Sequence, residues 1–87
     1  MTMAESRGYS SRLIETNKHA PATHPGVMLG RLCIAQDIPV ADVAQFFDVS
    51  RMTIYKWFKG TEMPRKKQIE KIEDVVAKLK LKSGAGK

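Results

Sequence analysis

Residues 40–60 constrain the fold most, because they hold two short helical patterns with only three residues between them. In the first pattern, four apolar side chains share one helix face: Val40, Val43, Ala44 and Phe47. In the second, the inward side chains are Ile54 and Trp57, with Phe58 beside them. A turn of three to four residues sets two helices at roughly 90–120°, so they cross and do not pack antiparallel. The segment therefore predicts two crossing helices, 40–47 and 51–59, around an apolar interior.

The residues at the ends of these helices agree with that prediction. Pro39 can open the first helix, because proline is favoured at a helix start. Ser50 is a good N-cap for the second helix. Gly60 follows the second helix, where a C-terminal glycine belongs.

Two further helices flank this pair. Residues 27–36 carry apolar side chains at helical spacing, and this helix ends before Pro39, which disfavours helical geometry in the preceding residue. Pro64 opens a later helix near its first position, and that helix carries an apolar stripe of Ile69, Ile72, Val76 and Leu79. The stripe is most simply core, and its near-heptad spacing also suits a dimer seam. Strand signals are nearly absent, so the sequence predicts an all-α fold: a small helical domain of four or five helices.

The two ends of the chain predict less order than its centre. Residues 1–24 are mostly polar, so we expect a flexible N-terminal arm with one or two helical turns around residues 11–18. The domain itself is expected over residues 25–82, and residues 83–87 are expected to form a disordered tail.

Charge favours an anionic partner. The 87 residues carry a formal net charge of +6 and have a pI near 9.7. Residues 64–87 hold eight Lys or Arg against three acidic residues. Between Asp48 and Glu62 the sequence holds three basic residues and no acid. Nucleic acid is the partner class that this distribution favours.

The outward face of helix 51–59 suits a DNA major groove. Four of its side chains cluster about 180° from the buried face, namely Met52, Tyr55, Lys56 and Lys59, with Arg51 and Thr53 on the flanks. Lys and Arg can donate to guanine, apolar groups can contact thymine methyls, and Tyr or Thr can reach phosphate. We therefore expect base contacts from Arg51, Met52, Tyr55 and Lys56. Backbone contacts are expected from Ser50, Thr53, Lys59, Arg65, Lys66 and Lys67.

Residues 38–64 resemble the Cro and phage-repressor (XRE-type) helix-turn-helix family. The matching positions are Ala44, Val49-Ser50, Ile54, Trp57, the closing Gly60, and Pro64 with the helix after it. The resemblance implies a repressor-like fold and a cytoplasmic, sequence-specific regulator of transcription, most simply a repressor. It also implies a partner of double-stranded DNA, bound with high specificity only as a homodimer on a two-fold site.

The chain departs from that family where the first helix begins. Members usually carry Gly at the position of Asp48, and often Ser or Thr at Pro39 and Gln at Val40, the last of which contacts a phosphate. The first helix has therefore lost its customary phosphate contact. Arg65-Lys66-Lys67 would take it over, because three cations in a first helical turn otherwise oppose the helix dipole, by about 0.3–1 kcal/mol each.

Other function classes find little support in the sequence. It has no nucleophile elbow, phosphate loop or acid/base pair, so we expect no enzyme, and it implies no cofactor or small-molecule ligand. His19, His24 and Cys33 lack the paired short spacings of a zinc site, so we expect no metal. No apolar run is long enough to span a membrane. There is no signal-peptide h-region and only one cysteine, which fits a cytoplasmic location.

Two alternative functions remain open at this point. The first is a phage DNA-packaging or replication accessory protein that uses the same motif. The second is a protein-binding module, such as an inhibitor of a host enzyme, in which the motif serves only as scaffold.

Overall fold

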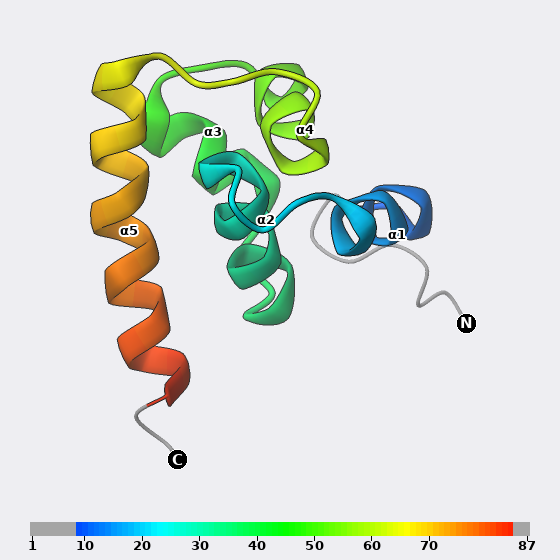
Figure 1. The fold of residues 1–87 in the computed structure, drawn as a ribbon, viewed down its shortest axis with the longest axis horizontal. Coiled ribbons are helices and arrows are strands. Elements are labelled where there is room, and N and C mark those ends of the chain that lie inside the picture. Colours follow the sequence, from blue (N-terminus) through cyan, green and yellow to red (C-terminus); the bar gives the residue numbers. More distant parts are fainter. Residues whose placement is uncertain (1–8, 85–87) are drawn as a thin grey trace.

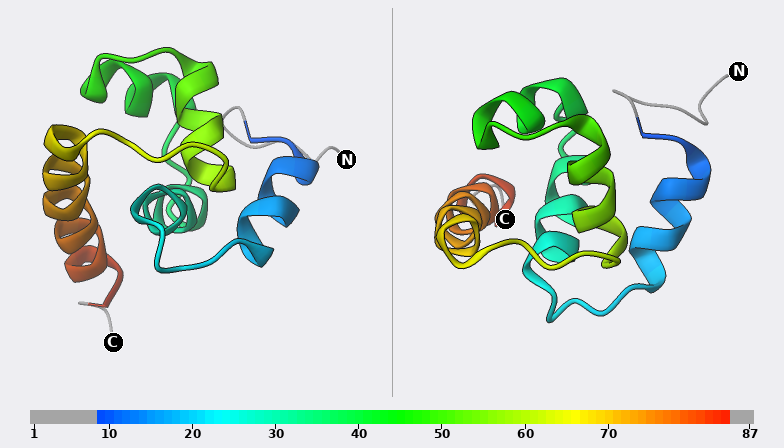
Figure 2. Two further views of the ribbon diagram at one scale, coloured as in Figure 1. Left: turned by 45° about the horizontal axis from the view of Figure 1, so that its top comes forward. Right: turned by 90° about the horizontal axis from the view of Figure 1, so that it is seen from above.

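The computed structural model describes residues 9–84, with the side chains of residues 9–82, and every helix or strand in that range is an α-helix (Figure 1). The helices are α1 (Ser11–His19), α2 (Pro25–Ala35), α3 (Val40–Phe47), α4 (Arg51–Lys59) and α5 (Lys66–Gly84). Helix α2 lies at the centre and packs against α1, α4 and α5. The long α5 runs along one side of the molecule, with α1 at the opposite side (Figures 1 and 2). The all-α prediction is confirmed.

The short pair α3 and α4 has the predicted bounds, and its end residues act as expected. Asp48 adopts a left-handed backbone at the end of α3, with a φ of 59°. The Ser50 Oγ caps α4 by accepting a hydrogen bond from the Thr53 amide at 3.2 Å. Gly60 closes α4 with a φ of 80°, a conformation that glycine adopts without steric cost.

The outer helices differ from the predicted bounds at their ends. Helix α2 begins at Pro25, because the His24 Nδ1 accepts a hydrogen bond from the Gly26 amide at 3.0 Å and so caps it. Helix α5 begins at Lys66, two residues after Pro64, which is buried. It continues to Gly84, so the expected tail holds two residues of helix, and residues 85–87 lie outside the described range.

The predicted inward faces of α3 and α4 are confirmed as core. All seven of their side chains are buried: Val40, Val43, Ala44, Phe47, Ile54, Trp57 and Phe58. The rings of Phe47 and Trp57 meet edge to face, 5.7 Å apart between centroids. In the stripe of α5, Ile72 and Leu79 are buried, and Ile69 and Val76 are half-buried.

Helices α2 and α4 approach so closely that two positions of α2 admit only glycine. A Cβ on Gly26 would lie 2.7 Å from the Trp57 carbonyl oxygen. A Cβ on Gly30 would lie 2.6 Å from the Phe58 Cγ and 2.8 Å from the Asn17 Nδ2. Because real Cβ atoms do not approach other atoms this closely, any side chain at either position would push α4 away from α2.

Asn17 joins three helices at this point of close approach. The side chain is only 2% exposed, and its Nδ2 donates to the carbonyl oxygens of Phe58 at 2.7 Å and Val27 at 3.2 Å. These bonds tie α1 to the end of α4 and to the start of α2. A buried carbonyl left unpaired would cost stability, so this amide fixes where α1 sits.

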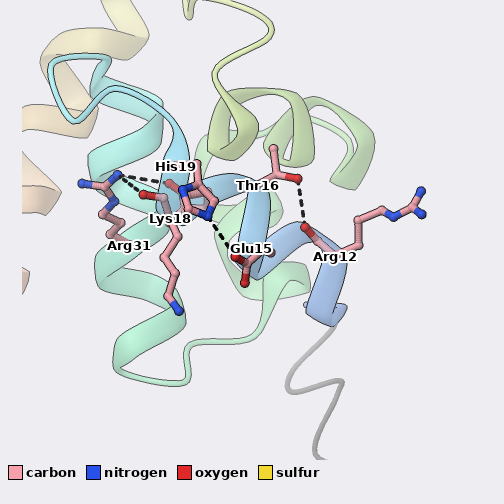
Figure 3. A network of polar contacts seen from close by, with 7 residues as sticks. Arg12, Glu15, Thr16, Lys18, His19 and Arg31 are labelled. Carbon is pink, nitrogen blue, oxygen red and sulfur yellow. Dashed lines mark hydrogen bonds and ion pairs between the residues drawn. The ribbon is translucent and has the colours of Figure 1, made fainter.

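The segment expected to be a flexible arm is packed from residue 9 onward. Tyr9 is buried, its ring lies 5.8 Å from that of Phe58, and its hydroxyl donates to the Ile38 carbonyl at 2.7 Å. Arg31 of α2 donates to three carbonyl oxygens at the end of α1, those of Asn17, Lys18 and Ala20. Figure 3 shows Arg31 beside Lys18. The expected helical turns at 11–18 are present as α1, but α1 belongs to the domain. Residues 1–8 of the predicted arm lie outside the described range.

We expect Asn17→Ala to lower the free energy of unfolding by about 1–3 kcal/mol, because it leaves the buried Phe58 carbonyl without its donor. Urea unfolding at equilibrium measures this change. The control is Lys18→Ala, the next residue on α1, whose exposed side chain should change the value by less than about 0.5 kcal/mol. Equal effects of the two substitutions would contradict the role of the amide.

Alkaline pH should destabilise the fold through Cys33. Burial raises the pKa of its thiol from 9.0 to about 12, so the unfolded chain releases this proton first. The stabilisation is complete below pH 9 and is lost as pH rises toward 12, by up to about 1.4 kcal/mol per pH unit. Burial also raises the pKa of Tyr9, so the measured quantity is the difference between wild type and Cys33→Ala. Unfolding curves of equal pH dependence would refute this assignment.

Candidate nucleic-acid interface

The outer face of α4 is a cationic, accessible surface. Arg51, Lys56 and Lys59 are exposed, and Met52 is 62% exposed. Thr53 lies at a flank of this face, as predicted, and is half-buried. Tyr55, which was predicted to lie on the face itself, is also half-buried because its ring packs against the core. All six side chains that the sequence placed on the face or its flanks therefore reach the surface, and the two half-buried ones mark its edges.

The first turn of α4 is held by its own hydroxyl groups. In addition to the Ser50 cap, the hydroxyl oxygens of Ser50 and Thr53 lie 3.1 Å apart, within hydrogen-bonding distance. Ser50 was predicted to contact DNA backbone, and in the structure it is exposed and fixes the start of the helix. These bonds fix the backbone of Arg51 and Met52, the first two residues of α4.

Two hollows border the outer face of α4, one on each flank. The α1 hollow lies between α1 and α4 and is lined by Ser10, Arg12, Leu13, Thr16, Met52, Tyr55 and Lys59. The α5 hollow lies between α4 and the segment that enters α5, and its lining includes Thr53, Trp57, Glu62, Arg65, Lys66 and Lys67. In both views of Figure 2, α4 is flanked by α1 on one side. The residues with predicted DNA contacts thus lie on α4 and around these hollows.

The α5 hollow gathers the three cations that the sequence singled out. Arg65, Lys66 and Lys67 are all exposed and stand where α5 begins. The first turn of α5 contains no acidic residue, so its dipole adds positive potential there. A polyanion at this place would relieve the repulsion between the cations and the helix dipole.

Glu62, which follows the acid-free stretch 49–61, is an acid that lies near the outer face of α4. Its Oε1 lies 3.9 Å from the Lys56 Nζ, and both side chains are about half exposed. An ion pair this exposed contributes at most about 1 kcal/mol, so Lys56 can exchange Glu62 for a stronger anion. Residues 49–61 contain no acid, but the fold brings the next residue, Glu62, beside the outer face of α4.

Helix α3 offers no cation to an anionic partner. Its sequence contains neither Lys nor Arg, and its N-cap residue, Pro39, makes no side-chain capping bond. Val40, the first residue of α3, is only 4% exposed and belongs to the core. Val40 therefore has a packing role.

Lys71 has a structural contact that the sequence did not reveal. Its Nζ donates to the Phe46 carbonyl at 2.9 Å, near the end of α3, and lies 4.6 Å from the centroid of the Phe46 ring. This lysine lies over the Phe46 ring, although 54% of the residue stays exposed. Lys71 thus ties α5 to α3, unlike the three cations at the start of α5.

The histidines and the cysteine serve packing and capping. His24 caps α2, the His19 Nε2 lies 2.9 Å from the Glu15 Oε2 (Figure 3), and Cys33 is buried in the core. Across residues 9–84, no three His, Cys, Asp or Glu side chains gather in an arrangement that could hold a metal ion. Among the helices described, none has the length and apolar character needed to cross a membrane.

Comparisons of this chain with protein-family models, with curated proteins and with solved structures gave no match.

Proposed function

We propose that this protein binds double-stranded DNA at specific sequences and regulates transcription, as a repressor does, with α4 lying in the major groove. The observation that carries the proposal is the outer face of α4, where Arg51, Lys56 and Lys59 surround the exposed Met52. An α-helix with its side chains is about 10–12 Å across, and a B-DNA major groove is about 12 Å wide. The resemblance to Cro and phage repressors supports the same function.

The proposed roles follow from where each side chain lies. Arg51, Met52, Tyr55 and Lys56 read base edges. Ser50, Thr53, Lys59, Arg65, Lys66 and Lys67 hold the sugar–phosphate backbone. Phosphate contacts set the register of the helix on the duplex, and base contacts supply the sequence information.

Specific binding by this protein calls for two copies. A single small module buries about 600–1,000 Å² of protein surface on DNA. Two copies on a two-fold site, with half-sites about 34–36 Å apart, double the contacts and require both half-sites to match. Selection from a random duplex library tests the whole proposal: an enriched palindromic site supports it. Recovery of no preferred sequence would favour the alternative of a module that binds an acidic protein.

Removing the two cations that read bases should abolish sequence preference. We expect Arg51→Ala combined with Lys56→Ala to lower the ratio of specific to non-specific affinity by about 1–3 kcal/mol per lost base contact, with the fold intact. Binding to the selected duplex and to a scrambled duplex measures this ratio. The matched control is Lys80→Ala with Lys82→Ala, which removes two exposed charges from the far end of α5 (Figure 1). A double variant that keeps the parent's ratio would disprove the role of these side chains.

The cations at the start of α5 should act on every sequence alike. We expect Arg65→Ala to weaken binding to all duplexes and to reduce the slope of log K against log salt by about one unit per protomer. Titrations at several salt concentrations measure the slope. Lys80→Ala makes the same charge change outside the proposed interface and should leave the slope unchanged. If the two variants share one slope, Arg65 is only a solvated surface charge.

A further inference from the structure

We propose that α1 is a second backbone-binding element, in which Arg12 binds phosphates of the DNA strand opposite to the one held by Arg65, Lys66 and Lys67. This inference rests on the proposed function, and it assigns a role to a helix that lies outside the family resemblance.

Helix α1 is held in one position by contacts along its length. Tyr9 enters the core before the helix begins, Asn17 bonds to α2 and α4, and Arg31 binds the carbonyl groups at its end. A flexible arm would lose conformational entropy on binding DNA, whereas a docked helix has already lost it on folding. The groups on the outer surface of α1 are therefore preorganised relative to α4.

The guanidinium of Arg12 is available for an external anion. The side chain is exposed, and no ion pair or side-chain hydrogen bond occupies it within the described residues. Figure 3 shows it extending away from the Glu15–His19 pair and from the bonds of Arg31. Only the backbone is engaged, where the Arg12 carbonyl accepts a hydrogen bond from the Thr16 hydroxyl at 2.9 Å.

The lining of the α1 hollow suits a phosphodiester strand. Arg12 and Lys59 supply two cations from two helices, and none of the lining residues is acidic. Ser10 and Thr16 add hydroxyl groups. The lining of the α5 hollow, by comparison, includes one acid, Glu62, beside its three cations. The charge of the α1 hollow therefore complements a polyanion at least as well as that of the α5 hollow.

The width of the major groove places α1 over the DNA backbone. Packed helices lie about 8–10 Å apart between axes, whereas a major groove about 12 Å wide admits one helix. When α4 fills the groove, α1 stands over the strand at the groove edge.

The α5 hollow faces the other edge of the groove. Thr53 lines that hollow and Tyr55 lines the α1 hollow, and at 100° per residue these two side chains point about 160° apart around α4. Because one strand borders each edge of a major groove, the two sets of cations meet different strands.

The test compares Arg12→Ala with Lys18→Ala on the same helix. Lys18 is exposed, lines neither hollow and points away from Arg12 in Figure 3, so its removal is a matched loss of charge. Salt titrations against a mixed-sequence duplex should give a slope lower by about one unit per protomer for Arg12→Ala, and the wild-type slope for Lys18→Ala. Circular dichroism checks that both variants keep the helical fold. Equal slopes for the two variants overturn this inference and leave the proposed function standing.

Phosphate ethylation interference tests the assignment to opposite strands. On the duplex recovered by selection, Arg12→Ala should lose interference at phosphates of one strand, and Arg65→Ala at phosphates of the other, in each half-site. Losses on the same strand overturn the inference. If the wild-type protein binds no duplex at all, the proposed function fails first, so the two failures are distinguishable.

Discussion

The close approach of α2 and α4 is the constraint on which the rest of the structure depends. Gly26 and Gly30 let the backbone of α2 lie against Trp57 and Phe58, and no side chain fits between them. The same missing Cβ at Gly30 leaves room for the Asn17 amide, which bonds to the carbonyl at the end of α4. These two glycines of α2 thus determine how closely α4 packs against α2, and they leave room for α1 to pack beside α4.

In this arrangement one face of α4 packs in the core and the opposite face lies at the surface. One face is held against α2 and α3 by aromatic packing, and the hydroxyl cap of Ser50 fixes its first turn. The other face is left to the surface, between the α1 hollow and the α5 hollow. Because α3 carries no cation, the positive charge near α4 comes from α4 itself and from its two flanks.

Local signals in the sequence predicted α3 and α4 to the residue, because caps and apolar spacing act within one turn of helix. Ser50 and Gly60 each take the backbone conformation that their residue type favours, and Asp48 takes a left-handed conformation that aspartate tolerates better than most residues. The packing of α1 was not predictable in this way. Tyr9 bonds to a carbonyl 29 residues away, and Asn17 to one 41 residues away. Polar side chains with distant partners leave no periodic signal, and the contact of Lys71 with Phe46 was missed for the same reason.

The bonds of Asn17 and Arg31 have a mechanical consequence for the proposed complex with DNA. They join α1, α2 and α4 into one body, so the distance between α1, which carries Arg12, and the outer face of α4 is fixed. A groove that is much wider or narrower than this distance would have to deform, because only the Arg12 side chain, and not the helix that carries it, can adjust. Base steps that no side chain touches would then influence affinity through their stiffness.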